Sequence, residues 1–191
     1  MAKRKEGKIG DRIHWVDAGS EASVKITGKV EGWKEGLLVA WVAAWIFCGA
    51  VVVYEIFNPY ERSIKLVLFV FLIFWAYYLW KVGKTLLYRI YGYELMQIGS
   101  GELLLQRKWL GGGSPQRFRI EDLGPLERTK LSPRSWAYTY ENLFWVIGGE
   151  RLAFKHGDRY VAFGLQLDDK QVSALYSFLR KHMLKHRHSG S

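Results

Sequence analysis

Three basic residues around a glycine-rich segment are the strongest candidates for binding chemistry. Lys108 precedes residues 111–115 (GGGSP), and Arg117 and Arg119 follow them. Alternate residues of a strand face the same way, so the two arginines should project together, and a flexible loop would let Lys108 close over a phosphate. The spacing predicts contacts with an anionic lipid headgroup. The alternative is chance, because a chain with 28 Lys and Arg produces many such spacings.

Other titratable groups have plainer explanations than catalysis or metal binding. Three histidines near the C-terminus could share a helix face, but no cysteine or nearby acid completes a metal ligand set: His182, His186 and His188. Two acidic pairs suit a strand end and a helix N-terminus, respectively: Glu121 with Asp122, and Asp168 with Asp169. Catalysis by either pair would need a cleft and a raised pKa. We therefore expect no catalytic residue, no metal, no cofactor and no enzymatic activity.

Two apolar stretches dominate the first half of the chain. Residues 37–54 and 66–80 contain no charged side chain. A helix needs about 20 apolar residues to cross a hydrocarbon core of about 30 Å. We therefore predict transmembrane helices at 37–57 and 64–82, joined by a tight turn at 58–63.

The distribution of Lys and Arg indicates the orientation of this hairpin. Eight of them lie before residue 37, two lie in or beside the turn, and eighteen lie from Lys81 onward. Positively charged flanks stay on the cytoplasmic side, so both termini should be cytoplasmic. The net charge of +10 then follows from topology, and we expect no nucleic acid partner. Three juxtamembrane basic residues should hold the following domain close to anionic lipids: Lys81, Lys84 and Arg89.

The hairpin divides the chain into three parts. These are a cytoplasmic N-terminal segment at 1–36, the membrane hairpin at 37–82, and a cytoplasmic domain at 83–191. In the first part, apolar residues alternate with polar ones, which fits either a short strand that joins the sheet or a segment on the membrane surface: Val24, Ile26 and Val30.

Small residues recur every fourth position along the first span. They form a ridge on one helix face, which we call the small-residue face: Gly36, Ala40, Ala44 and Cys48. The ridge either receives the bulky residues of the second span (Phe71, Trp75 and Tyr78) or docks onto a helix of another membrane protein. Similarly, Trp41 and Trp45 could contact a pigment, quinone or lipid, although aromatics four apart are more often packing residues. Cys48 is the single cysteine, so the chain forms no internal disulfide.

The part after the hairpin is rich in short strand patterns and ends in one helix. We predict strands at 88–98, 102–109, 116–120, 138–147, 152–155 and 159–163, with tight turns at 99–101 and 156–158. Asp168 or Asp169 should cap a helix with an apolar stripe: Val172, Leu175, Tyr176, Leu179 and Met183. The fold class is therefore a membrane α-hairpin plus a mostly-β, α+β domain, in which an antiparallel sheet or barrel carries one C-terminal helix.

This order of parts resembles the bacterial membrane-anchored PH-like domain proteins over roughly residues 37–185. The matching segments are 93–107, 117–123 (RFRIEDL) and the exit Phe163-Gly164-Leu165 into the helix at Asp168. The spacing of Lys108, Arg117 and Arg119 is also similar to the headgroup-binding pattern of eukaryotic PH domains. A second resemblance, to the two-span photosystem I assembly factors, rests on hairpin position, Gly92-Tyr93 and residues 117–123.

Both resemblances imply an anchored accessory, scaffold or assembly subunit rather than a catalyst. Its expected partners are a larger integral membrane protein complex and membrane lipids, with residues 130–136 touching the partner. The implied location is the bacterial cytoplasmic (inner) membrane, as a multi-pass protein. The other reading left by the sequence is a lipid-sensing module that uses Lys108, Arg117 and Arg119.

Overall fold

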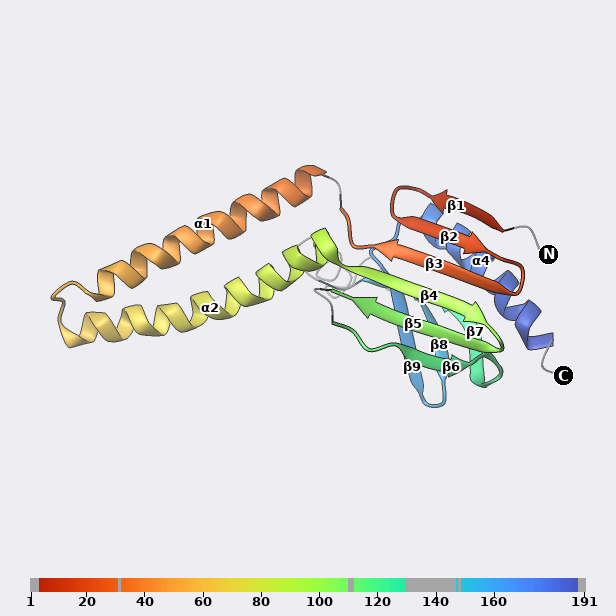
Figure 1. Ribbon diagram of the computed structural model, residues 1–191. Coiled ribbons are helices and arrows are strands. Elements are labelled where there is room, and N and C mark those ends of the chain that lie inside the picture. The colour runs from red at the N-terminus through yellow and green to blue at the C-terminus, as the bar shows by residue number, and fades with distance from the viewer. Residues whose placement is uncertain (1–3, 31, 110–111, 130–146, 148, 189–191) are drawn as a thin grey trace.

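The computed structural model describes residues 4–30, 32–109, 112–129, 147 and 149–188. Two long helices form a hairpin that projects from one end of a β-rich unit (Figure 1). That unit, called the β-unit below, contains two antiparallel sheets and a C-terminal helix. The predicted helical hairpin, antiparallel sheets and closing helix are therefore present.

The helices of the hairpin are α1 (Gly32–Ile56) and α2 (Arg62–Tyr91), and each is long and apolar enough to cross a membrane. The second helix is longer than predicted, because residues 88–91, expected to begin a strand, form its last turn. It ends at Gly92, where the backbone becomes extended and the N–H still donates to the Tyr88 carbonyl at 2.7 Å. At 1.5 Å per residue, α2 is about 45 Å long, so its last turns extend beyond a hydrocarbon core of about 30 Å.

Packing inside the hairpin uses a different face of α1 from the one predicted. Leu38 and Val42 are buried against α2, whereas all four residues of the small-residue face are exposed. Of the two roles that the sequence left open for this face, the structure does not show the one in which it receives the second span. The observed contact positions also recur at spacings of four and three, and they carry the larger side chains that fill the space between the two helices.

Two tryptophans join the helices halfway along the hairpin. The indole N–H of Trp45 donates to the Trp75 carbonyl at 3.2 Å, and the indole N–H of Trp75 donates to the Trp45 carbonyl at 2.7 Å. Gly49 makes this approach possible, because a Cβ at that position would overlap the Trp75 indole. Trp41 stacks on Trp45 with ring centroids 5.0 Å apart, which favours a packing role for this aromatic pair.

The larger sheet has six strands in the order β1-β2-β3-β4-β5-β6, all antiparallel. Its strands are β1 (Lys5–Ile9), β2 (Ile13–Asp17), β3 (Glu21–Thr27), β4 (Tyr93–Gly99), β5 (Glu102–Lys108) and β6 (Gln116–Arg119). The segment containing Val24 and Ile26 is thus a strand of the sheet. The larger sheet therefore includes three strands from the segment before the hairpin, beginning at Lys5, as well as strands from the part after it.

The helical hairpin is inserted between two neighbouring strands of this sheet. Strands β3 and β4 pair without a register shift from Glu21 opposite Gly99 to Thr27 opposite Tyr93. Residues 28–92, which contain both long helices, therefore replace the loop of a β-hairpin. Figure 1 shows that the start of α1 and the end of α2 lie at the same end of the β-unit.

The smaller sheet has the order β7-β8-β9 and faces the larger sheet across a shared core. Its strands are β7 (Leu123–Arg128), β8 (Glu150–His156) and β9 (Arg159–Leu165), and the short helix η1 (Ile120–Asp122) leads into it. The predicted pairing of 152–155 with 159–163 is confirmed by the register of β8 and β9. The predicted strand at 138–147 and the predicted partner contact at 130–136 fall outside the described residues, apart from residue 147.

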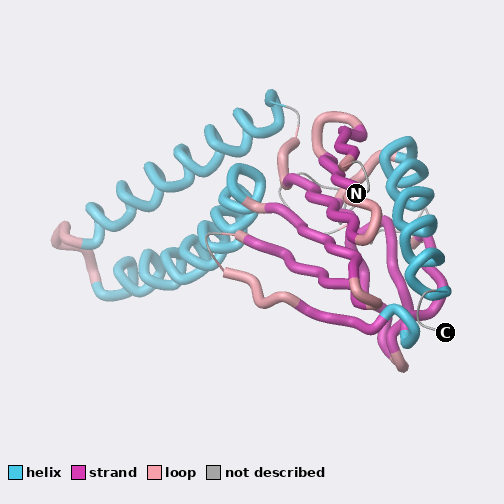
Figure 2. The backbone as a smooth tube through the Cα atoms, turned by 45° about the vertical axis from the view of Figure 1, so that its right-hand side comes forward, coloured by secondary structure: helices cyan, strands magenta, loops and turns pink. Residues whose placement is uncertain are grey.

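Helix α4 (Asp169–His188) packs against η1 and four strands from both sheets. In both views of the backbone it lies on the side of the β-unit away from α1 and α2 (Figure 2). Asp168 caps it: its carboxylate accepts from Gln171 N at 2.7 Å, and the Gln171 side chain accepts from Asp168 N at 3.2 Å. The predicted apolar stripe is confirmed, with Val172, Leu175, Leu179 and Met183 buried and Tyr176 partly buried.

Substitution of Gly49 tests the tryptophan contact inside the hairpin. We expect Gly49→Ala to destabilise the protein in mild detergent by about 1–3 kcal/mol, the usual cost of overpacking, because the new methyl group displaces the Trp75 indole. The measurement is the thermal unfolding midpoint. The control is Gly36→Ala, where an added Cβ meets nothing within 4 Å. Equal midpoints for the two variants would contradict the packing described for Trp45 and Trp75.

Candidate functional site

The place where the helical hairpin joins the β-unit holds two buried charged side chains, Arg89 and Glu94, with half-buried polar residues around them. We call it the junction, and its members come from three parts of the chain: Arg12, Gly28, Arg89, Glu94, Arg107 and Gln166. Gly28 N donates to the Gly92 carbonyl at 2.9 Å, so the pairing of β3 with β4 continues to the foot of α2. A Cβ at Gly28 or Gly92 would overlap Tyr88, which explains why glycine stands at both positions.

Two arginines hold the turn between β9 and α4 from opposite sides. Arg12 donates to the carbonyls of Gln166 at 2.7 Å, Leu165 at 3.0 Å and Thr27 at 3.1 Å. Arg89, which is 1% exposed, donates to the Gln166 side-chain oxygen at 2.6 Å. Gln166 itself has a φ of +48°, so the turn is held in a conformation that L residues rarely adopt. Burial lowers the pKa of Arg12, although several neighbouring acidic groups raise it.

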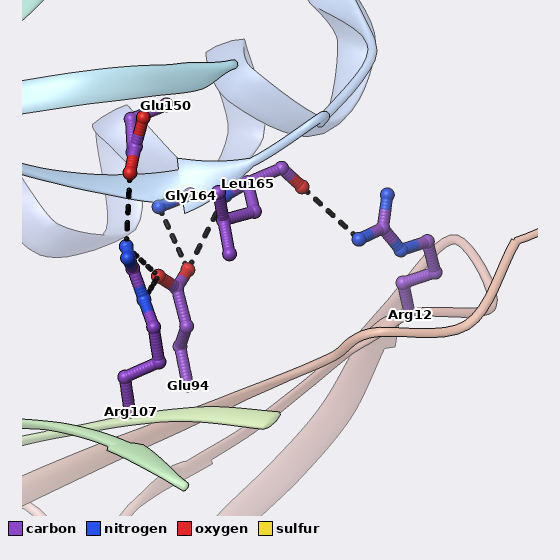
Figure 3. A network of polar contacts seen from close by, with 6 residues as sticks. All are labelled: Arg12, Glu94, Arg107, Glu150, Gly164 and Leu165. Atoms are coloured by element: carbon purple, nitrogen blue, oxygen red, sulfur yellow. Dashed lines mark hydrogen bonds and ion pairs between the residues drawn. The ribbon is translucent and has the colours of Figure 1, made fainter. Parts of the chain in front are cut away.

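Glu94 is the buried acid of the junction, with only 1% of its surface exposed. Figure 3 shows its carboxylate between Arg107 and the backbone of β9. One oxygen accepts from Arg107 Nε at 2.9 Å and Nη2 at 2.7 Å, and the other accepts from Gly164 N at 2.8 Å and Leu165 N at 3.3 Å. Arg107 also reaches Glu150 at 3.2 Å. Burial lowers the pKa of Arg107, but Glu94 and Glu150 outweigh it, so the net direction is upward.

This arrangement joins elements mechanically and offers no reactive group. Both oxygens of Glu94 are occupied by donors, and arginine does not titrate near neutral pH. In the described ranges, no group of three or more His, Cys, Asp or Glu side chains could hold a metal ion. What the junction does is connect α2, β3, β4, β5 and β9 through charged hydrogen bonds, which are stronger than neutral ones.

The structure does not bring together the three residues predicted to bind a headgroup. Arg117 and Arg119 do share a face of β6, but they lie opposite Leu104 and Glu102, while Lys108 lies opposite Tyr93 at the other end of β5. Four strand residues, about 13 Å, separate the Lys108 and Arg117 positions. Arg119 also forms an ion pair with Glu121 at 3.1 Å. The predicted site is therefore not formed as a unit.

The juxtamembrane residues divide into two groups. Lys81 and Lys84 are exposed on α2, Lys81 at the end of the predicted span and Lys84 just beyond it. Arg89 is not a lipid contact, because it is buried in the junction. This correction follows from the length of α2: one more turn of helix carries Arg89 into the β-unit.

The histidines also differ from one another in their environment. His182 is buried, with Nε2 3.4 Å from Asp17, while His186 is half-buried and the His188 side chain is outside the described residues. Desolvation lowers the pKa of His182; Asp17 raises it, and Lys181, Lys185 and His186 lower it further. Three of the four residues in the acidic pairs make structural contacts. Asp168 caps α4, Asp169 pairs with Arg151 at 2.5 Å, and Glu121 pairs with Arg119.

The alternation of residues in β4 and β5 could have indicated the junction from the sequence, but the sequence-based prediction of a site used only the spacing of basic residues. In β4, Glu94 is an even number of residues from the buried Met96 and Ile98, so its side chain points to the same face of the sheet. In β5, Arg107 has the same relation to the buried Leu103 and Leu105. Two opposite charges therefore stand directly across from each other on the core face.

Comparison with known proteins finds no matching protein family, no similar curated protein and no similar solved structure.

Removing the buried carboxylate tests the junction directly. We expect Glu94→Ala to lower the free energy of unfolding by about 3–5 kcal/mol, because Arg107 would lose its nearer partner and the buried N–H groups of Gly164 and Leu165 would lose their acceptor. The measurement is denaturant unfolding of the purified protein in mild detergent. Glu121→Ala, which removes an exposed partner of Arg119, should cost less than about 1 kcal/mol. Similar losses in both variants would show that Glu94 is not a central contact.

The buried histidine predicts how stability changes with pH. Because the folded-state pKa of His182 lies below the unfolded value of about 6.5, the unfolded chain binds more protons as the pH falls. The thermal midpoint should therefore fall as the pH is lowered through about 6.5, and His182→Gln should flatten this part of the curve. His156→Gln, at an exposed position, is the matched control and should leave the slope unchanged. An unaltered slope in His182→Gln would refute the assignment.

Proposed function

We propose that this protein is a non-catalytic, membrane-anchored accessory, scaffold or assembly subunit of a larger integral membrane protein complex. The observation that carries the proposal is the insertion of α1 and α2 between the paired strands β3 and β4. A domain attached in this way is joined to α2 through the single residue Gly92, so it has no linker on that side. It would hold its surfaces at a fixed height and angle above the bilayer, which suits a subunit that positions other proteins.

The proposed orientation places the β-unit in the cytoplasm of a bacterial cell, at the inner membrane. The N-terminal strands and the C-terminal helix belong to the same unit, so both ends of the chain share one side of the hairpin. The excess of Lys and Arg outside the turn favours the cytoplasmic side for that unit. The hairpin turn, with Arg62 and Lys65 near it, would face the opposite side.

The fold order supports a PH-like assignment as part of the proposal. Four consecutive antiparallel strands (β3 to β6), three more (β7 to β9) and one closing helix follow the order of parts expected for bacterial membrane-anchored PH-like proteins. Assembly factors of the two-span photosystem I type remain the alternative within the same functional class. In both cases the protein would act by contact, without chemistry of its own.

The small-residue face of α1 is the surface proposed to meet a partner helix. It is exposed, and it lies away from the contact with α2, which uses Leu38 and Val42. Small side chains allow close approach of helix backbones in a membrane, where van der Waals packing drives association.

A substitution on this face tests the proposed docking. We expect Ala44→Leu to reduce the amount of co-purifying membrane protein at least about fivefold, because overpacking a helix contact costs about 1–3 kcal/mol. The measurement is mass spectrometry of the protein purified from native membranes in mild detergent. Its thermal midpoint should not change, since Ala44 does not contact α2.

Ala50→Leu is the matched control, because this exposed alanine of α1 is neither three nor four residues from any member of the small-residue face. It should retain the co-purifying proteins. Recovery of the wild-type protein as a lone monomer or homodimer would contradict the proposed function, and equal losses in both variants would contradict the assignment of the docking face.

A further inference from the structure

The membrane-proximal end of the larger sheet gathers lysines around two aromatic side chains. We call this group the basic collar: Lys25, Lys84, Lys108, Tyr93 and Trp109. Its members come from β3, α2 and the β4–β5 pair, and the register of the sheet and the position of α2 bring them together. The group differs from the one expected from sequence, since Arg117 and Arg119 are at the distal part of the sheet.

Ring contacts place two of the lysines. Lys25 Nζ lies 4.4 Å from the centroid of the Tyr93 ring, and Lys84 Nζ lies 5.0 Å from the Trp109 ring. Lys108 stands directly across from Tyr93 in the β4–β5 pairing and immediately before Trp109. On β3, Lys25 comes two residues before Thr27, the residue opposite Tyr93. Lys25 and Lys108 therefore point to the same, outward face of the sheet. Lys25 and Lys108 thus flank Tyr93 on the outward face of the sheet, and Lys84 lies beside Trp109, the residue that follows Lys108.

The collar carries a concentrated positive charge. Lys25 and Lys84 are exposed and Lys108 is half-buried. In the part of the chain that the structure describes, none of these three ammonium groups forms an ion pair with a carboxylate. Like charges at one end of the sheet repel one another, and a bound anion would reduce that repulsion.

The position of the collar selects the kind of anion. Lys84 lies two residues beyond Val82, where the predicted span ends, so it stands at headgroup level if α2 crosses a bilayer. Its contact with Trp109 brings the end of β5 to the same region. Half-buried Tyr and Trp next to lysine are typical of membrane interfaces, because their rings favour the boundary between apolar and polar layers.

We infer that the basic collar binds the phosphate of an anionic lipid headgroup at the foot of the hairpin. This inference rests on the proposed function, in that α1 and α2 must be membrane anchors. The bound phosphate lies among Lys25, Lys84 and Lys108, and Tyr93 and Trp109 contact the glycerol and upper acyl region. The junction fixes the β-unit relative to α2, so the collar is held at the height where such headgroups lie.

The experiment compares lipid adducts of the full-length protein by native mass spectrometry. Purified protein in mild detergent is titrated with phosphatidylglycerol. The comparison lipid is zwitterionic phosphatidylcholine, which has no net charge. We expect the triple variant Lys25→Gln/Lys84→Gln/Lys108→Gln to bind phosphatidylglycerol on the order of 100-fold more weakly at low salt, at about fivefold per lysine near an anionic headgroup. Binding of phosphatidylcholine should not change.

The matched control removes three positive charges from the same sheet face at positions outside the collar: Lys8→Gln/Arg117→Gln/Arg119→Gln. It should bind phosphatidylglycerol like the wild type, and Lys25→Arg/Lys84→Arg/Lys108→Arg should retain most of the binding. Equal weakening in the collar and control variants would overturn the inference. Unchanged binding in the collar variant, with an unchanged thermal midpoint, would also overturn it.

Two further arms separate the remaining explanations. Inorganic phosphate is added as a competitor; complete displacement at millimolar concentration would identify a free-phosphate site and overturn the lipid assignment. Loss of a co-purifying acidic protein from the collar variant, with lipid adducts retained, would identify a protein-binding surface instead.

Extraction of native membranes with alkaline carbonate separates a failure of this inference from a failure of the proposed function. Protein released by carbonate would show that the hairpin is not an anchor, which removes the basis of both. Protein that resists extraction but shows no lipid preference would overturn the lipid site alone.

Discussion

The pairing of β3 with β4 is the constraint on which the rest of the structure depends. These strands are separated in sequence by both long helices, yet their register is continuous from Glu21–Gly99 to Thr27–Tyr93. Backbone hydrogen bonds across this pair require the start of α1 and the end of α2 to lie close together. The helices must therefore be antiparallel, and the parts of the chain before and after them must share one unit. Closing such a long loop has a modest entropic cost, because this cost grows only slowly with loop length.

The hydrogen bonds of the junction make the connection between the helical hairpin and the β-unit stiff. Arg89 at the end of α2, Arg12 after β1 and Glu94 at the start of β4 all reach the segment 164–166 that precedes α4. Each contact is a charge-assisted hydrogen bond at a buried or half-buried position, where an unmade bond is costly. Movement of α2 relative to the β-unit would break several of these bonds together. The fixed placement of the basic collar and of the small-residue face relative to the sheet follows from that stiffness.

Some elements were readable from the sequence because their signals are local. The apolar lengths predicted α1 and α2, the glycine turns predicted the β4–β5 and β8–β9 hairpins, and the spacing from Val172 to Met183 predicted α4. Others were not, because their signals conflict. Strand β7 contains Gly124 and Pro125, which usually argue against a strand, but both fall at a register irregularity where a missing N–H is tolerated. The last turn of α2 carries tyrosine and isoleucine, which also fit a strand, and only the pairing of β4 from Tyr93 decides the boundary.

By itself, then, the sequence determined element lengths, the positions of the apolar segments and the sign of the charge around them, since these depend on neighbouring residues alone. Tertiary structure decided which surfaces are free. The small residues of α1 face outward because larger neighbours at Leu38 and Val42 fill the contact with α2. Arg89 is buried and Lys84 exposed, although both are basic residues in the same helix, because only one of them points into the β-unit. Lys108 separates from Arg117 and joins Lys25 because strand register, rather than distance along the chain, sets which side chains are neighbours.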